Sequence, residues 1–183
     1  MASLQQSRLT LVSGPVKSGK SKWAEQILQD YSNVTYVATL FSDKEDINWL
    51  DRISKHKQRR PSSWKLIENI IDLNSLFAGI SSNEPILIDS LGGIILKYLN
   101  YNDYEWTAIE SQFLRLVQTF TNHIVLVIEE VGWGISPPTI EANLFRDRLG
   151  ELVHKLEYIA HDSWLVLHGR AINLTDIGST ILL

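Results

Sequence analysis

The feature that most constrains this chain is a segment of eight residues whose fixed positions match the phosphate-binding pattern G-x-x-x-x-G-K-[ST]. The segment reads Gly14-Pro15-Val16-Lys17-Ser18-Gly19-Lys20-Ser21. An apolar run, Leu9–Val12, precedes it, and a helix-like stretch, Lys22–Leu28, follows it. This is the order of strand, loop and helix that the motif requires. We therefore predict a nucleotide-binding loop (a P-loop) at residues 14–21.

The residue types within the loop explain how it would hold a triphosphate. Gly14 and Gly19 let the backbone turn tightly and bring its N–H groups against phosphate oxygens. The N-terminus of the following helix adds a positive partial charge. Lys20 supplies a mobile charge for the outer phosphates, and the Ser21 hydroxyl is a ligand for Mg²⁺. The alternative is a glycine-containing turn that fits the pattern by accident, and the flanking elements disfavour it.

Composition limits the classes of protein to which this chain belongs. A length of 183 residues suits one domain spanning residues 1–183. A net charge of −4 provides no general basic field, which argues against nucleic-acid binding as the main activity. The chain has no cysteine, so thiolate chemistry is excluded and the reducing cytoplasm is the expected location. No apolar run approaches the roughly 20 residues needed to span a membrane.

Short apolar runs alternate with longer helical patterns, as is typical of buried parallel strands joined by crossover helices. The predicted strands cover Leu9–Ser13, Val34–Ala38, Trp64–Glu68, Ile86–Asp89, Ile124–Glu130 and Trp164–Leu167, with Ala171–Leu174 pairing back as an antiparallel edge strand. The predicted helices cover Lys20–Asp30, Asp46–Arg59, Leu73–Ile80, Gly93–Leu99, Trp106–Thr121 and Ile140–Ala160. This order predicts an α/β fold of the P-loop NTPase type, with a doubly wound, mostly parallel sheet and helices on both faces. Ligands then bind at the carboxyl ends of the strands.

An acidic residue ends one of these predicted strands. Asp89 closes the run Ile86–Ile88, where a P-loop protein is expected to hold Mg²⁺ directly or through water. We predict Asp89 and Ser21 as the metal ligands. Two alternatives stay open: Asp89 or Ser90 caps a helix, or Glu130, which also ends an apolar strand, faces the metal instead.

A second unusual stretch, residues 51–61, concentrates cations around His56. On a helix Arg52 lies one turn before His56, so the two share a face. Cationic neighbours disfavour the protonated imidazole and keep it in the neutral form that can act as a nucleophile. His56 is therefore a candidate for covalent nucleotidyl transfer. From these residues alone, a solvated basic helix or an anion-binding patch is the simpler interpretation.

Other candidates carry less information. Residues 131–138 form a loop marked by glycine and proline at the end of a predicted strand, where substrate loops belong. Within it, Trp133 either stacks on a ligand or covers the core. Arg146 would bind phosphate or, more simply, pair with Asp147. The remaining four histidines, such as His168 beside Gly169, are expected to be surface or core residues.

Taken together, these motifs follow one another at the spacing of a known family. They are the P-loop, Tyr36-Val37-Ala38-Thr39, Arg52-Ile53-x-x-His56 with Arg60-Pro61 and Trp64, Asp89, Glu130-Val131-Gly132-x-Gly134-Ile135-x-Pro137, and Phe145-Arg146-Asp147-x-x-Gly150. From about Leu9 to Leu174 the sequence resembles the bifunctional adenosylcobinamide kinase / adenosylcobinamide-phosphate guanylyltransferase family of cobalamin biosynthesis.

The resemblance implies two reactions that use Mg²⁺ and a nucleoside triphosphate, GTP or ATP for the phosphorylation and GTP for the guanylylation. A nucleoside triphosphate phosphorylates the corrinoid adenosylcobinamide, and a guanylylated His56 then passes GMP to adenosylcobinamide phosphate. The implied nucleotide contacts are Gly14, Pro15, Val16, Lys17, Ser18, Gly19, Lys20, Ser21, Ala38, Thr39, Leu40, Lys57, Gln58, Arg59, Arg60, Glu68 and Asp89. Lys20 and His56 are the implied catalytic residues. The family also implies a homotrimer.

The sequence departs from the family pattern at a few positions. Glu129 stands where many members have Asn, and Gly92-Gly93 replaces a position that usually carries Thr. Lys97 and Val153 each occupy a place where Asn is common. Two other functions therefore remain as alternatives: a P-loop kinase of a small metabolite for which His56 is dispensable, and a GTP-binding relative without catalysis.

Overall fold

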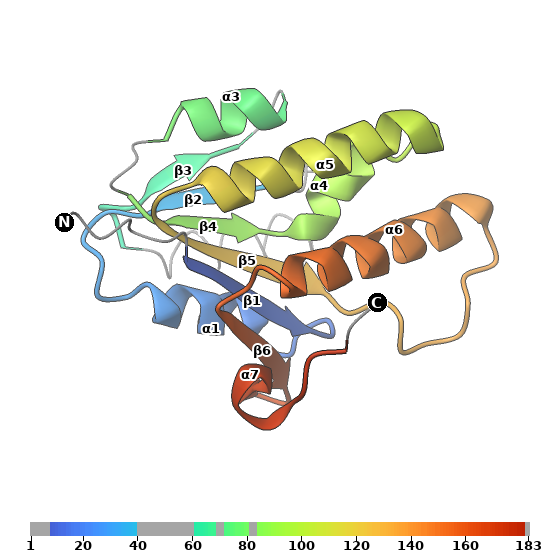
Figure 1. The fold of residues 1–183 in the computed structure, drawn as a ribbon. Coiled ribbons are helices and arrows are strands. Elements are labelled where there is room, and N and C mark those ends of the chain that lie inside the picture. The colour runs from blue at the N-terminus through green and yellow to red at the C-terminus, as the bar shows by residue number, and fades with distance from the viewer. Residues whose placement is uncertain (1–7, 40–60, 69–71, 81–83, 182–183) are drawn as a thin grey trace, which may run out of the picture.

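Seven strands form one sheet in the computed structural model, which describes residues 8–39, 61–68, 72–80 and 84–181 (Figure 1). The strand order is β3-β2-β4-β5-β1-β6-β7. The strands are β1 (Arg8–Gly14), β2 (Thr35–Ala38), β3 (Lys65–Ile67), β4 (Ile86–Asp89), β5 (His123–Glu129), β6 (Asp162–Leu167) and β7 (Arg170–Asn173). All neighbouring pairs are parallel except β6 and β7, which are antiparallel. The predicted parallel sheet with an antiparallel edge strand is confirmed.

Helices cover both faces of this sheet. They are α1 (Lys20–Ile27), α3 (Leu73–Ala78), α4 (Leu91–Lys97), α5 (Asp103–Thr119), α6 (Ile140–Glu157) and α7 (Leu174–Ile177). One face packs Val12 and Val127 against Ala24 and Leu28 of the α1 segment. The other face buries its side chains under α3, α4, α5 and α6 (Figure 1). The arrangement is that of a doubly wound α/β protein, as predicted.

Several helix boundaries differ from the predicted ones, and α7 was not predicted. Helix α5 begins three residues earlier than expected because Asn102 and Glu105 form a capping box, with Glu105 N donating to Asn102 Oδ1 at 3.0 Å and Asn102 N donating to Glu105 Oε2 at 2.9 Å. Helix α4 begins at Leu91, so Gly92 and Gly93 lie within its first turn. The predicted helix Asp46–Arg59 lies outside the described residues.

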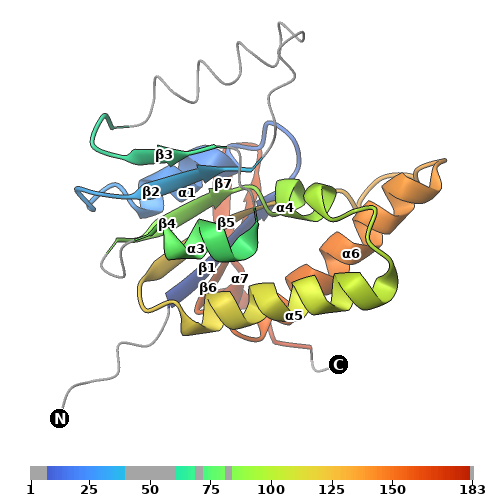
Figure 2. The same cartoon turned by 90° about the horizontal axis from the view of Figure 1, so that it is seen from above.

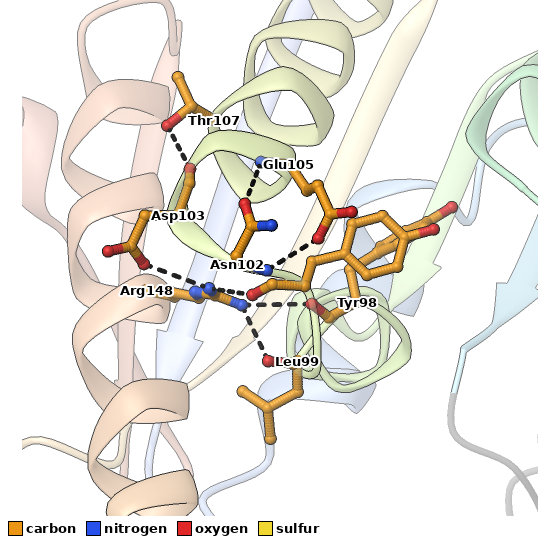
Figure 3. A network of polar contacts seen from close by, with 8 residues as sticks. Tyr98, Leu99, Asn102, Asp103, Glu105, Thr107 and Arg148 are labelled. Atoms are coloured by element: carbon orange, nitrogen blue, oxygen red, sulfur yellow. Dashed lines mark hydrogen bonds and ion pairs between the residues drawn. The ribbon is translucent and has the colours of Figure 1, made fainter.

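A buried arginine of α6 joins three helices. Arg148 donates to three backbone carbonyl oxygens between α4 and α5, those of Tyr98 at 3.2 Å, Leu99 at 3.0 Å and Tyr101 at 2.7 Å (Figure 3). Its guanidinium also lies 3.6 Å from a carboxylate oxygen of Asp103. The Tyr98 carbonyl also accepts from the Tyr101 N–H at 3.1 Å, and Arg148 adds a donor to it and to the two carbonyls that follow. Arg148 therefore fixes the α4–α5 turn against α6.

The N-terminal ends of α5 and α6 extend past the carboxyl ends of the central strands (Figures 1 and 2). Loop 130–139 runs from the end of β5 out to the start of α6. Of the helices in the described ranges, none is both long and apolar enough to cross a membrane.

Candidate nucleotide-binding site

The predicted P-loop joins the carboxyl end of β1 to the start of α1. Gly14 has φ +155° and Gly19 has φ +104°, backbone conformations that a side chain disfavours. A Cβ atom on Gly14 would collide with the carbonyl oxygen of Val166 and lie 2.8 Å from Ser18 Oγ. The loop can therefore lie this close to β6 only because residue 14 is glycine.

Lys20 lies at the first position of α1, buried to 7% exposure. Its Nζ atom donates to the carbonyl oxygen of Pro15 at 3.2 Å, so the ammonium group turns back into the loop that precedes it. Val16 and Lys17 are exposed at the apex of the loop, whereas Ser18 is buried. Ser21 follows in the first turn of α1 and is half-buried. A cation and a hydroxyl thus stand at the helix N-terminus, where anions bind.

A second group of predicted residues meets at the carboxyl ends of β2 and β4. Ala38 and Asp89 are paired in register, and the Thr39 N–H donates to the Asp89 carbonyl at 3.1 Å. The Asp89 carboxylate accepts a hydrogen bond from the Tyr36 hydroxyl at 2.6 Å. Because only β5 separates β4 from β1, this group lies two strand spacings from the P-loop, about 10 Å. A hydroxyl, a carboxylate, phosphate oxygens and water form the donor set that Mg²⁺ prefers, so Ser21 and Asp89 fit the ion by chemistry.

The two acids at the end of β5, Glu129 and Glu130, have different surroundings. Glu129 uses both carboxylate oxygens at the start of α4, accepting from the Ser90 hydroxyl and, at 3.0 Å, from the Gly92 N–H. The Glu130 N–H donates to the Gly14 carbonyl at 3.1 Å, which places Glu130 beside the P-loop. Its carboxylate accepts from the Gly132 N–H at 3.1 Å. Ser90, not Asp89, is the residue before α4.

Two departures from the family pattern prove to be one structural feature. A Cβ atom on Gly92 would lie 2.6 Å from Glu129 Oε2, so the larger acid is accommodated only where residue 92 lacks a side chain. A Cβ atom on Gly93 would collide with the Thr39 hydroxyl and lie 2.7 Å from its backbone carbonyl carbon. Glu129 and the two glycines therefore pack α4 closely against the end of the sheet.

The hairpin between β6 and β7 lies against the P-loop. This neighbour of the P-loop was not predicted from the sequence. The Gly169 N–H donates to the Ser18 carbonyl at 3.0 Å. A Cβ atom on Gly19 would lie 3.8 Å from Val166 Cγ1 and 3.9 Å from Gly169 Cα. The available signal was His168-Gly169 between two strand-like runs, a spacing typical of a two-residue hairpin.

Other predicted residues lie apart from this group or outside the described ranges. Glu68 is exposed just after β3, which is four strand spacings from β1, about 19 Å. Trp133 is 62% exposed, so the alternative that it covers the core of the described part is wrong. Arg146 pairs with Asp147 at 3.1 Å, as the simpler interpretation predicted. The predicted residues outside the described ranges are Leu40, His56, Lys57, Gln58, Arg59 and Arg60.

Within the described ranges no three histidine, aspartate or glutamate side chains gather into a metal-binding cluster. The metal ligands predicted above are instead one serine and one carboxylate, which would complete the coordination of Mg²⁺ with phosphate oxygens and water.

Comparison with known proteins assigns the family. The family model described as "CobU: Cobinamide kinase / cobinamide phosphate guanyltransferase" matches residues 10–174. The bifunctional adenosylcobalamin biosynthesis proteins CobU of Escherichia coli K12 and of Salmonella typhimurium LT2 are 31% and 32% identical over 181 residues, each covering 91% of this chain and 99% of the relative. A solved structure from Pyrococcus horikoshii OT3 has 10% identity and a TM-score of 0.57 over 97% of this chain and 92% of that one, a likeness of fold alone. The chain therefore belongs to the cobinamide kinase / cobinamide phosphate guanyltransferase family.

Proposed function

We propose that this protein phosphorylates adenosylcobinamide and then converts adenosylcobinamide phosphate to adenosylcobinamide-GDP, as a bifunctional enzyme of cobalamin biosynthesis. Two relatives that align over nearly their whole length are bifunctional adenosylcobalamin biosynthesis proteins. The observation that carries the proposal is the position of Lys20, a buried cation at the N-terminus of α1 that turns into a glycine-bounded loop. This geometry suits the outer phosphates of a nucleoside triphosphate.

The kinase step is an in-line displacement at the γ-phosphorus. The aminopropanol hydroxyl oxygen of adenosylcobinamide attacks the γ-phosphorus, the bond to the β–γ bridging oxygen breaks, and the nucleoside diphosphate leaves. The hydroxyl proton passes to water. Lys20 and the N–H groups of the loop stabilise the charge on the transferring group. Mg²⁺, bound by Ser21 and by Asp89 or Glu130, would add positive charge at the β- and γ-phosphate oxygens.

The guanylyltransferase step uses His56 as a nucleophile. An imidazole nitrogen attacks the α-phosphorus of GTP, the α–β bridging bond breaks, and pyrophosphate leaves. A phosphate oxygen of adenosylcobinamide phosphate then attacks the same phosphorus, and the phosphorus–nitrogen bond breaks to release His56. Support for this role is the match of Arg52-Ile53-x-x-His56 to the family motif and the family membership itself.

The proposal includes a single catalytic domain that acts in the cytoplasm as a homotrimer. The family resemblance supports the trimer. Exposed apolar side chains on loop 130–139 and at the start of α6, those of Trp133, Ile135 and Ile140, offer a surface that a neighbouring subunit would cover.

Labelling with GTP that carries the isotope on its α-phosphate tests the second activity. Wild type incubated with this GTP and Mg²⁺ should take up covalent label that is released by acid and retained in base, because a histidine phosphoramidate has this stability. His56→Ala should take up none. His154→Ala is a matched control, because His154 lies on α6 and has no predicted role.

The outcome separates three functions. Label on wild type and His154→Ala but not on His56→Ala supports the bifunctional enzyme. Phosphorylation of a small acceptor without label points to a simple P-loop kinase. Binding of GTP with neither label nor phosphorylation points to a relative without catalysis, and equal labelling of His56→Ala contradicts the role of this histidine.

A further inference from the structure

The tip of the β6–β7 hairpin is built into the wall of the P-loop, and neither proposed reaction gives it a role. The Gly169 N–H is bonded to the Ser18 carbonyl at 3.0 Å, and the glycines of the P-loop let β6 approach its backbone closely. The hairpin therefore keeps a fixed position relative to the phosphate cradle. Any side chain at its tip is held beside a triphosphate in the loop.

Two such side chains are exposed there. His168 and Arg170 flank Gly169, and both lie open to solvent at the end of the sheet that carries the P-loop. Within the described ranges neither of these two side chains has a hydrogen-bond or ion-pair partner. His168 has φ +49° and Gly169 has φ +76°, the left-handed pair that a two-residue turn requires. A histidine is uncommon at such a position, where asparagine and glycine satisfy the turn more easily.

The chemistry of γ-phosphoryl transfer decides which part of the substrate reaches this hairpin. The attacking and leaving oxygens lie roughly in line, so the acceptor and the nucleoside occupy opposite sides of the γ-phosphorus. Asp89 ends β4 and Glu130 directly follows β5, and both strands lie on one side of β1. The β6–β7 hairpin lies on the other side of β1. We place the acceptor on the side of β1 that carries Asp89 and Glu130. The nucleoside then extends to the other side of β1, over the hairpin.

We propose that the tip of the β6–β7 hairpin binds the nucleoside end of the triphosphate in the kinase reaction. The imidazole of His168 stacks on the purine base, and the guanidinium of Arg170 binds the α-phosphate. This inference rests on the proposed function. Two nucleotide contacts implied by the family resemblance, Ala38 and Glu68, lie across the sheet on β2 and after β3, and we assign them to guanylylation. The P-loop would then serve two nucleoside positions, one for each reaction.

The variant His168→Asn, Arg170→Gln tests this subsite. Asparagine tolerates the left-handed backbone of residue 168, so the turn is kept while the imidazole is removed. Arg115→Gln is the matched control, because Arg115 is exposed on α5. For each full-length protein, calorimetry gives the Kd of Mg²⁺–ATP and of Mg²⁺–pyrophosphate. Kinase assays give the KM for ATP, and uptake of α-phosphate label from GTP reports guanylylation.

The double variant should raise the Kd and KM for ATP about 10-fold, the size expected for the loss of one base-stacking contact. Its affinity for pyrophosphate and its guanylylation should equal those of wild type and of Arg115→Gln. Unchanged affinity for ATP overturns the proposal. Equal weakening of ATP and pyrophosphate also overturns it, since the P-loop itself would then be disturbed, and an equal loss of guanylylation contradicts the second nucleoside position. If wild type fails to phosphorylate adenosylcobinamide, the function proposed above fails, whereas the two Kd values still decide this inference.

Discussion

Two buried cations, Lys20 and Arg148, are satisfied in different ways. Arg148 is 3% exposed, and its three carbonyl partners lie 47 to 50 residues away in the sequence. It also lies 4.9 Å from the centre of the Trp106 ring. Lys20 is 7% exposed, and the carbonyl that holds it belongs to Pro15, five residues earlier in its own loop. A charge that joins distant segments stabilises the fold, whereas a charge held within one short loop is placed for a ligand.

The largest expected effect is on kinase turnover, from a substitution at Lys20. Lys20→Ala should lower kinase turnover by about 10²- to 10³-fold, because the charge that stabilises the transferring phosphoryl group is removed. The free energy of unfolding should change less than the turnover, since the Pro15 carbonyl that accepts from Lys20 lies in a loop with an exposed apex. Steady-state kinetics with adenosylcobinamide and urea unfolding measure the two quantities. Lys22→Ala, an exposed lysine of the same helix, is the control. Undiminished phosphorylation by Lys20→Ala would rule out its catalytic role.

At Arg148 we expect the opposite result, a loss of stability with little change in nucleotide binding. Arg148→Met keeps the apolar stem but leaves buried carbonyls of the α4–α5 turn without a donor, which should lower the free energy of unfolding by about 3 kcal/mol. The KM for nucleotide should stay near that of wild type, because the network lies away from the P-loop. Urea titration of this variant beside Arg115→Met, a change at an exposed site, measures the difference. Equal stability of the two variants would show that the Arg148 network contributes nothing.

The difference between contacts near in the sequence and contacts far apart in it also explains which features the sequence could predict. The P-loop was predictable because its glycines, Lys20 and Ser21 are neighbours in the chain and each has a local requirement. The parallel order of strands followed from short apolar runs such as Ile86–Asp89. The role of Arg148 was not predictable, because its partners are backbone carbonyls far away in the sequence, which carry no residue signature. The β6–β7 hairpin was predicted, but its position beside the P-loop was not, because the Gly169–Ser18 bond joins residues far apart in the sequence.

The pairing of Glu129 with Gly92 was visible in the sequence only as two separate departures from a family pattern. Each residue alone looked like a loss of a familiar side chain. The contact between the carboxylate and the α4 N-terminus shows that Glu129 takes this position because residue 92 is glycine. Coupled substitutions of this kind become interpretable only when the two positions are placed together.

His123 is a third buried side chain and lies at the amino end of β5, at the opposite edge of the sheet from the P-loop. The smallest effect on stability is expected here. His123 is 5% exposed, and its Nε2 atom lies 2.9 Å from the Thr10 hydroxyl. Burial, and then the charge of Arg8, lower the pKa of this imidazole to about 4. The unfolded chain binds a proton near the ordinary histidine pKa of about 6.5, so the folded state is favoured above that pH and loses stability as the pH falls toward 4. Urea titrations should show a loss of about 1 kcal/mol between pH 7 and pH 5.5 that is absent in His123→Phe, a variant that cannot titrate. Parallel curves for the two proteins would mean that His123 binds a proton as readily in the folded state as in the unfolded chain, which would contradict a pKa lowered by its burial.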